Sequence, residues 1–337
     1  MRIGIDIGGS HIAVGLVDNK GNIVIKKEKN INSDGRKNID KLIEETIAVA
    51  INEILRDNNI KIEDIEKIGI ACPGTSKDGV VVKAENLGIY DFHIVEKLQR
   101  YFSAPIKLSN DAKCAGLCEK KYGALKEYDD AIFMCLGTGI GGAVFMNGRM
   151  LVPKRHLGME IGHTLLKKDG LKCNCGRNGC FEVYASMKRL RDRIAQELNL
   201  SEDLNGEIIF ELAKREIEKI DDLLEEFADS LAEGITNLVN IFEPEAICIG
   251  GSYVYHTDIL GDKVDNALKK AKMYNGEIPK IVLAQFENDS GMIRSNIIID
   301  LSVGGCGPYI SNKNQETKNI KRKGTKNNGT TIHIKKL

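Results

Sequence analysis

The sequence predicts an α/β fold built from two related lobes, and three observations predict it. Apolar runs with strand character alternate with helical patterns along most of the 337 residues, which is typical of layered α/β domains. The order strand, glycine turn, strand occurs twice, at 2–18 and again at 131–146. At about 150 residues per domain, the chain also has the length of two domains.

Strands and helices alternate through the first half of the chain. The strands are apolar runs bounded by turns rich in Gly, Asn and Asp, and the helices have apolar side chains at a period near 3.6. We expect strands at 2–7, 12–18, 23–25, 65–71 and 106–109, and helices at 38–56, 92–101 and 112–122.

The second half repeats the strand pattern and then becomes mainly helical. A polar insert rich in glycine and cysteine, 167–179, precedes long helical patterns over 185–242. Beyond residue 310 the chain consists mainly of Asn, Lys, Thr and Gly, which predicts a disordered tail. We expect apolar strand segments at 131–136, 143–146, 246–249 and 280–284, and a last apolar segment at 292–301.

The charge balance excludes a protein that is basic throughout. Lys and Arg together number 48, and so do Asp and Glu, so a uniform nucleic-acid-binding surface is excluded. Residues 312–337 nevertheless carry eight basic residues against one Glu. This tail either contacts an anionic surface or is a solvated extension, and its Asn, Gly and Thr content favours the extension. We therefore expect no nucleic-acid partner.

Apolar segments of membrane length are missing from the sequence. The longest uncharged window, between Asp130 and Arg149, contains five glycines and falls short of the about 20 apolar residues of a membrane helix. The first residues also lack the apolar stretch of a secretory signal. We expect a cytoplasmic protein without a membrane partner.

Three of the nine cysteines lie within eight residues of one another. Cys173, Cys175 and Cys180 form with His163 the pattern His-x9-Cys-x-Cys-x4-Cys, a ligand set suited to tetrahedral Zn²⁺. Four protein ligands leave no open position, so the metal would be structural. The spacing leaves open the alternative of a reduced thiol cluster without metal.

Two glycine turns between strands are candidate phosphate-binding segments. The first, Asp6-Ile-Gly-Gly-Ser10, provides backbone amides for phosphate oxygens and a carboxylate that can hold Mg²⁺. The second, Gly137-Thr-Gly-Ile-Gly-Gly142, adds the hydroxyl of Thr138. The first turn alone is equally consistent with an ordinary hairpin. Together they are what a nucleotide facing two lobes requires.

Three further carboxylates are candidates for chemistry or binding. Asp111 follows Asn110 between a predicted strand and a predicted helix, where a carboxylate is either a helix cap or, at the mouth of a cleft, a base. Glu160 and Glu182 flank the cysteine segment. They either accept hydrogen bonds from a polyhydroxylated ligand or face water.

These elements together resemble the ROK family of bacterial sugar kinases and related regulators, within the actin and hexokinase superfamily. The resemblance spans about residues 2–303 and rests on eight stretches in order. They are Ile3-Gly-Ile-Asp-Ile-Gly-Gly-Ser10, Pro73-Gly74, Asn86-Leu87-Gly88, Asn110-Asp111-Ala112, Gly137-Thr-Gly-Ile-Gly-Gly142, Glu160-Ile-Gly-His163, Cys173-Asn-Cys-Gly-Arg-Asn-Gly-Cys-Phe-Glu182 and Gly250-Gly251.

The resemblance implies a two-lobed actin-like ATPase fold, related to ribonuclease H, with a central cleft for nucleotide and sugar. It implies a first lobe at 1–115, completed by a last helix near 290–310. The larger second lobe would be 116–289 and would include a zinc-binding loop at 163–180.

The resemblance also implies a role for each matching residue. Asp111 is implied as the general base for the sugar 6-hydroxyl, Asp6 as the residue that steers Mg²⁺, and His163 as a ligand that holds zinc with one nitrogen and contacts sugar with the other. The implied sugar-binding residues are Gly74, Asn86, Asn110, Asp111, Glu160, His163 and Glu182. The implied ATP-binding residues are Asp6, Gly8, Gly9, Ser10, His11, Gly137, Thr138, Gly139, Gly141, Gly142, Gly250 and Gly251. The implied zinc ligands are His163, Cys173, Cys175 and Cys180.

The implied activity is ATP-dependent phosphorylation of a hexose, with glucose as the first candidate, by a homodimer. The alternatives are an N-acetylmannosamine or N-acetylglucosamine kinase, a non-catalytic sugar-binding or regulatory protein, and polyphosphate as phosphate donor. Three positions depart from the family pattern. His11 follows Ser10 where Lys or Asn is usual, Met159 stands where Gly is usual, and Arg294-Ser-Asn296 replaces Gly-Ala-Ala.

Overall fold

The computed structural model describes residues 1–18, 22–31, 38–153, 159–201, 204–271, 273–274 and 276–286, apart from the side chain of Asn86. Its strands form two five-stranded mixed sheets and one three-stranded sheet. The α/β prediction is therefore confirmed. The apolar segment expected at 292–301, the helix expected near 290–310 and the tail at 312–337 lie outside the described residues.

The first sheet has the strand order β3-β2-β1-β4-β8. Strand β2 runs antiparallel to β1 and β3, whereas β1, β4 and β8 are parallel. Ile3, Ile5 and Ile7 are at most 1% exposed, because a period of two places them on the same face of β1. The strands are β1 (Arg2–Ile7), β2 (His11–Val17), β3 (Ile23–Asn30), β4 (Lys67–Cys72) and β8 (Ile106–Asn110).

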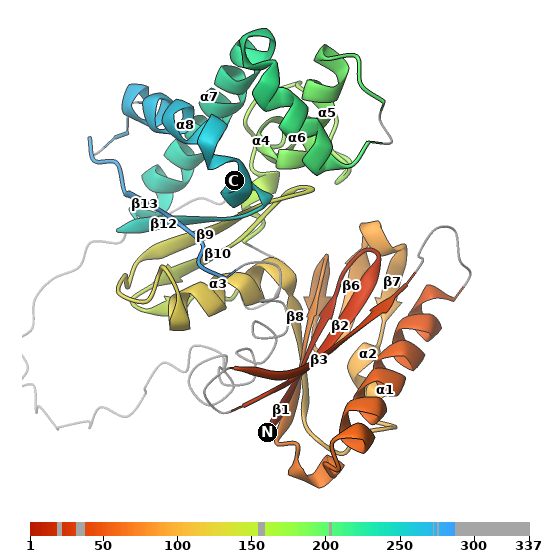
Figure 1. Ribbon diagram of the computed structural model, residues 1–337. Helices are drawn as coiled ribbons and strands as arrows, with labels where there is room; N and C mark the ends of the chain where they lie inside the picture. The colour runs from red at the N-terminus through yellow and green to blue at the C-terminus, as the bar shows by residue number, and fades with distance from the viewer. Residues whose placement is uncertain are drawn as a thin grey trace, which may run out of the picture. The chain divides into compact units, whose positions relative to one another are not determined.

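Helices α1 (Ile39–Asp57) and α2 (Ile94–Leu98) cover that apolar face (Figure 1). The helix predicted at 92–101 is thus shorter than expected. It begins later because Phe92 belongs to a strand. It ends at Leu98 because the N–H groups of Arg100 and Tyr101 bond to carbonyls three residues back, in a tighter turn.

A three-stranded antiparallel sheet lies between β4 and α2 in the chain, where the sequence indicated no element. Its strands are too short, and too exposed on one side, to form the apolar runs by which strands are predicted. The sheet consists of β5 (Thr75–Lys77), β6 (Val80–Ala84) and β7 (Ile89–Phe92), with the short helix η2 (Glu85–Leu87) between the last two.

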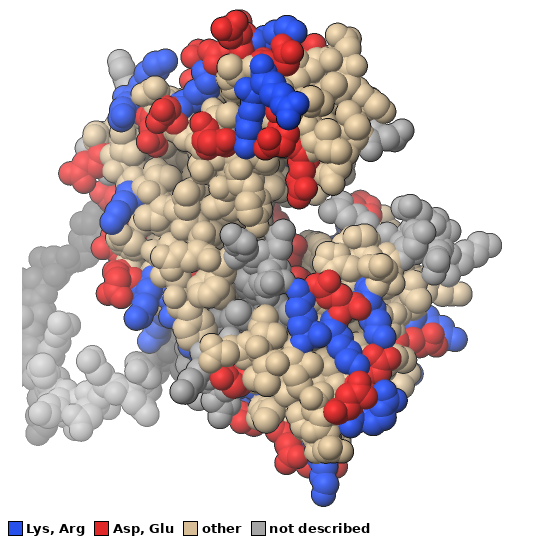
Figure 2. All heavy atoms as spheres, viewed as in Figure 1, with Lys and Arg blue, Asp and Glu red and all other residues tan. Residues whose placement is uncertain are grey.

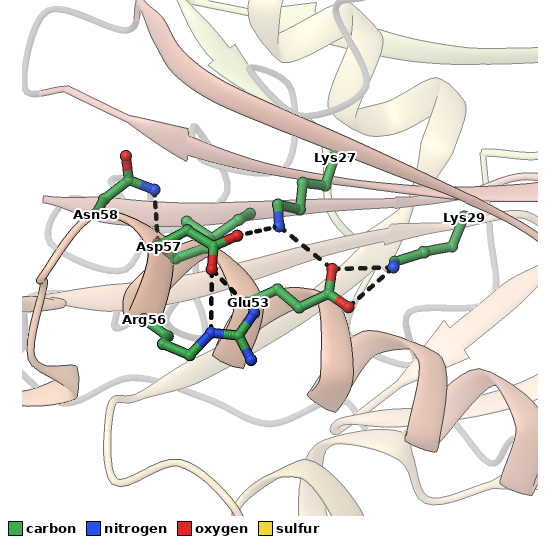
Figure 3. A network of polar contacts seen from close by, with 7 residues as sticks. Lys27, Lys29, Glu53, Arg56, Asp57 and Asn58 are labelled. Atoms are coloured by element: carbon green, nitrogen blue, oxygen red, sulfur yellow. Dashed lines mark hydrogen bonds and ion pairs between the residues drawn. The ribbon is translucent and has the colours of Figure 1, made fainter.

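Strand β3 is an edge strand, and charged side chains protect it. Lys27 and Lys29 point across to α1, where the Nζ of Lys27 lies 2.7 Å from Asp57 Oδ2 and the Nζ of Lys29 lies 2.9 Å from Glu53 Oε2 (Figure 3). These ion pairs join β3 to α1, which the apolar core holds on the sheet. Lysines on an edge strand also disfavour pairing with another chain.

The second sheet has the order β11-β10-β9-β12-β13, and its central strand β9 faces two cores. Ile132 and Met134 pack against one helical layer, whereas Ala131 and Phe133 pack against helix α3 (Asp111–Tyr122) on the other face (Figure 1). The strands are β9 (Ala131–Leu136), β10 (Ile140–Met146), β11 (Arg149–Met150), β12 (Ala246–Gly251) and β13 (Lys280–Leu283).

The helical layer opposite α3 consists of separate helices within the segment 185–242, where the sequence indicated long helical patterns, together with α8. A new helix begins after Asn205 because its side chain accepts a hydrogen bond from the Glu207 N–H and caps the turn. The layer comprises α4 (Glu182–Ala185), α5 (Met187–Glu197), α6 (Gly206–Arg215), α7 (Ile217–Phe242) and α8 (Thr257–Lys270). Within the described ranges, no helix combines the length and the apolar character needed to cross a bilayer.

Candidate functional site

The carboxyl ends of three parallel strands bring Asp6 and Asp111 to one edge of the first sheet. In the strand register, Asp6 of β1 pairs with Ala71 of β4, and Cys72 of β4 pairs with Asn110 of β8. Burial raises the pKa of the Cys72 thiol, and the nearby charges of Asp111 and Asp6 raise it further. Both carboxylates therefore lie within electrostatic range of the same buried atom.

Asn110, not Asp111, is the cap of helix α3. Its Oδ1 accepts a hydrogen bond from the Lys113 N–H at 3.1 Å. Its Nδ2 donates to the Gly74 carbonyl at 3.0 Å and to Asp111 Oδ1 at 2.9 Å. The Ala112 N–H donates to the same Asp111 oxygen at 2.8 Å. The half-buried carboxylate of Asp111 thus stands at the first helical position, oriented by two donors.

Gly74 lies beside this cap because it has no side chain. Its φ is +84°, and a Cβ there would overlap the Lys83 carbonyl oxygen and the Ala84 backbone of strand β6. Both facts require glycine. The predicted sugar-binding residue Asn86 lies in η2, next to β6, but its side chain is outside the described residues.

The first glycine turn joins β1 to β2 and exposes its polar groups. The Gly8 N–H donates to the His11 carbonyl at 2.9 Å, which closes the turn. Gly9, Ser10 and His11 are exposed, and Ser10 Oγ lies 3.4 Å from His11 Nδ1. The turn therefore presents a hydroxyl and an imidazole beyond the sheet edge.

The second glycine turn packs against the helix that carries Asp111. It joins β9 to β10, and the Gly137 N–H donates to the Gly139 carbonyl at 3.0 Å. A Cβ at Gly141 would lie 2.7 Å from the Cβ of Ala112, the residue after Asp111. A Cβ at Gly142 would overlap the Phe133 carbonyl oxygen. Glycine at 141 allows β10 to approach the first turn of α3, and glycine at 142 allows it to approach β9.

Gly250 and Gly251 end β12 next to this second turn. Their register partners are Cys135 and Leu136, the last residues of β9 before Gly137. Gly251 has a φ of +77°, and a Cβ there would overlap the Leu136 carbonyl oxygen. The two predicted nucleotide-binding segments of the second half are therefore adjacent.

His163, Cys173, Cys175 and Cys180 converge as the spacing predicted. Their ligand atoms all lie within 4.8 Å of one another. His163 Nδ1 is 3.7 Å from Cys173 Sγ, and Cys175 Sγ is 3.6 Å from Cys180 Sγ. Ligands about 2.3 Å from a tetrahedral zinc ion are about 3.8 Å apart. The four residues thus fit Zn²⁺.

The electrostatics of this cluster depend on burial. Burial raises the pKa of Cys173 and of Cys180. Burial also opposes ionisation of Cys175, but hydrogen bonds from the Arg177 backbone and from the Cys173 and Cys180 thiols leave its pKa below the usual range. Cys175 is therefore the thiol most ready to ionise and accept a cation.

Glu182 lies between the cysteine cluster and the second glycine turn. Its Oε1 accepts from Cys173 Sγ at 3.1 Å and lies 3.4 Å from His163 Nδ1. Its Oε2 accepts from the Ile140 N–H at 3.4 Å, and a Cβ at Gly139 would overlap that oxygen. The side chain, predicted to bind sugar, therefore also links the cluster to the turn.

Glu160 is paired with a lysine that the sequence reasoning missed. The Nζ of Lys113, on α3, lies 3.5 Å from Glu160 Oε1. A cation in the first turn of a helix opposes the helix dipole, and this signal could have singled out Lys113. Met159, which precedes Glu160, has a φ of +67°. Its backbone thus lies in the left-handed region, which favours glycine.

A cavity of about 380 Å³ between α7 and α8 lies apart from all of these residues. One of its charged lining residues, Lys263, is paired, with Nζ 2.7 Å from Asp221 Oδ1. Figure 2 shows acidic and basic side chains interspersed on the viewed face of the molecule. None of the predicted site residues lines the cavity, so it does not belong to the candidate site.

The amino-acid sequence is similar to those of known proteins. A model described as "ROK family" matches residues 2–300. A glucokinase from Thermotoga maritima is 28% identical, with 90% of this chain and 98% of the relative covered. A glucokinase from Halalkalibacterium halodurans is 30% identical, over 86% and 92%. A xylose repressor from Bacillus subtilis is 26% identical, over 88% and 77%.

Solved structures show the same fold. A ROK hexokinase from Thermus thermophilus has a TM-score of 0.72 at 25% identity and covers 90% of this chain and 99% of its own. A ROK family glucokinase from Streptomyces griseus, in complex with glucose and AMPPNP, has a TM-score of 0.72 at 25% identity, over 87% and 97%. The predicted class, a two-lobed actin-like α/β fold, is confirmed.

Proposed function

We propose that this protein, which belongs to the ROK family, transfers the γ-phosphoryl group of ATP to the 6-hydroxyl of a hexose, most readily glucose. One observation carries the proposal. The carboxylate of Asp111 is held by Asn110 and Ala112 at the start of α3, at the sheet edge it shares with Asp6 and against the strand that follows the second glycine turn. The relatives named as glucokinases support the choice of reaction and of glucose.

Asp111 acts as the base in this proposal. Phosphoryl transfer depends on in-line positioning and charge neutralisation, so one oriented carboxylate is enough to accept the proton of the attacking hydroxyl. The two N–H donors on Asp111 Oδ1 fix the plane of the carboxylate. Asn110, Gly74, Asn86, Glu160, His163 and Glu182 would bind the remaining sugar hydroxyls.

ATP would lie along the two glycine turns. The exposed turn at Gly8–His11 and the turn at Gly137–Gly142 would offer backbone N–H groups to the phosphates, and Gly250-Gly251 would lie nearest the adenosine. Asp6 would hold Mg²⁺, which when bound neutralises charge on the phosphates. Polyphosphate is the alternative donor for the same turns.

His163, Cys173, Cys175 and Cys180 would hold a structural zinc ion, which when bound supplies rigidity to the loop and no chemistry. The Nδ1 atom of His163 faces the sulfurs. Its Nε2 would then be the atom that contacts sugar, with the ring oriented by the cluster. The homodimer, which the family resemblance implies, and the cytoplasmic location stay predictions.

Coupled ADP release over a panel of hexoses, with Mg²⁺ and ATP, tests the proposal. Asp111→Ala should keep the fold and the metal content but abolish hexose-dependent ADP release. Turnover of N-acetylmannosamine or N-acetylglucosamine in preference to glucose would favour the alternative kinases. ATP or sugar binding without turnover in the unmodified chain would contradict the proposal and favour a regulatory role, as in the xylose repressor among the relatives.

A further inference from the structure

Glu119 on α3 is a fully buried carboxylate that the proposed reaction does not use. Its side chain is 1% exposed. Oε1 accepts hydrogen bonds from the Gln285 N–H at 3.0 Å and the Phe286 N–H at 2.9 Å, and Oε2 accepts from the Ala124 N–H at 2.9 Å. A buried carboxylate is tolerated only with such partners. One side chain therefore accepts hydrogen bonds from three backbone N–H groups, one just after α3 and two near residue 285.

The position of Glu119 ties the helix of the proposed base to the second sheet. Helix α3 connects β8 of the first sheet to β9 of the second, and Asp111 is its first residue. Gln285 and Phe286 follow β13, the edge strand of the second sheet. Glu119 thus anchors the far half of α3 to the chain that leaves this edge.

Gly123 provides an independent observation of how tightly this anchor is built. A Cβ at Gly123 would overlap the Glu119 carboxylate and would lie 3.0 Å from the Phe286 ring. Gly123 has a φ of −116° and a ψ of −146°, outside the left-handed region. The space that the carboxylate occupies is therefore one reason why glycine is required here.

We propose that Glu119 is a positioning residue, which fixes the tilt of α3 and thereby the direction of the Asp111 carboxylate. The proposal rests on the proposed function of Asp111. At 1.5 Å per residue, Glu119 lies about 12 Å along the helix from Asp111. A tilt of about 5° about the anchor would move Asp111 by about 1 Å, and a misplacement of that size costs about 100-fold in rate.

Glu44 offers a matched control for a role limited to stability. It is the other buried carboxylate among the described residues, at 8% exposure. It lies on α1, with Oε2 3.3 Å from Lys97 Nζ and Oε1 accepting from Tyr101 Oη at 3.2 Å. These partners join α1 to α2 and its following turn, away from α3. Glu44→Gln should therefore lower the melting temperature without changing kcat.

The experiment compares Glu119→Gln, Gly123→Ala, Glu44→Gln and Asp111→Asn in the full chain, by coupled ADP release well below each melting temperature. Glu119→Gln should lower kcat about 10- to 100-fold while the KM for hexose and for ATP stays within about twofold. Gly123→Ala should lower kcat in the same way. Hydrogen exchange at 111–118 should accelerate in both variants but not in Glu44→Gln.

A folded Glu119→Gln variant with kcat within twofold of the unmodified protein would overturn the proposal. If Glu119→Gln fails to fold, Gly123→Ala decides, because it displaces the carboxylate without removing it. Unchanged kcat in that variant would be equally decisive against the anchor. Asp111→Asn separates the two proposals, since turnover retained by it would contradict the proposed base, whereas turnover lost by it and kept by Glu119→Gln would contradict only the positioning role.

Discussion

Gly141→Ala tests whether the second glycine turn and the proposed base are placed by one close contact. A Cβ at 141 would lie 2.7 Å from the Ala112 Cβ, and no other atom of a non-neighbouring residue in the described ranges would lie within 4 Å. Carbon atoms in contact lie about 3.5–4.0 Å apart, so β10 and α3 would have to separate by about 1 Å. Overpacking of this kind lowers the free energy of unfolding by about 1–3 kcal/mol. Each kcal/mol lowers the melting temperature by about 2–4 °C.

The same separation would move Asp111, the neighbour of Ala112, and a shift of about 1 Å would lower kcat about 100-fold. Ala112→Gly removes the colliding methyl group at a helix cost of about 0.5–1 kcal/mol. The double variant should therefore recover most of the kcat lost in Gly141→Ala. In the free energy of unfolding, the two substitutions should be coupled by about 1–2 kcal/mol.

Coupled ADP release and thermal unfolding of the four proteins of this double-mutant cycle would measure both quantities. Gly261→Ala on α8 is the control, because a Cβ there meets no atom within 4 Å among the described residues outside its chain neighbours and its own helix backbone. It should be neutral or raise stability by up to about 1 kcal/mol. Unchanged kcat and melting temperature in Gly141→Ala, or a double variant as impaired as Gly141→Ala, would refute the reasoning.

Three further predictions follow from the described contacts. Asn110→Ser keeps an oxygen that can cap α3, whereas Asn110→Ala does not, so the free energy of unfolding should be about 1 kcal/mol lower for the alanine variant. Both variants lose the amide Nδ2 that donates to Asp111, so kcat should fall about 10- to 100-fold in both. Retained kcat in the serine variant would exclude this orienting role. Cys180→Ser should remove zinc, measured by elemental analysis, and lower the melting temperature, whereas Asp111→Ala should keep about one zinc per chain. Burial lowers the pKa of His256, and the charge of Lys214 acts in the same direction. The unfolded chain therefore binds this proton more readily, so the contribution of His256 to stability should be constant above a pH of about 6.5 and fall below it. His256→Gln should flatten that slope in thermal unfolding, and an unchanged slope would assign it to other groups.

The sequence predicted the parts of the site that are encoded locally. Glycine turns between apolar strands, and a histidine with three cysteines at ligand spacing, are patterns that a linear chain displays directly. The linear sequence does not show which distant residues contact these parts of the site. Glu182 lies only two residues after Cys180, yet its contact with the Ile140 N–H depends on packing across 42 positions. Glu119 meets Gln285 over a still longer separation.

The choice between Asn110 and Asp111 as helix cap illustrates why neighbouring sequence cannot decide such questions. Asn and Asp are about equally favoured as helix N-caps, so local capping preference does not distinguish between the two residues. Strand pairing decides, because Cys72, the last residue of β4, pairs with Asn110 and keeps it in extended conformation. The helix must then begin one residue later. The strand register that β1 and β4 set, far back in the chain, thus makes the Asn110 amide the cap of α3 and places the Asp111 carboxylate at the sheet edge.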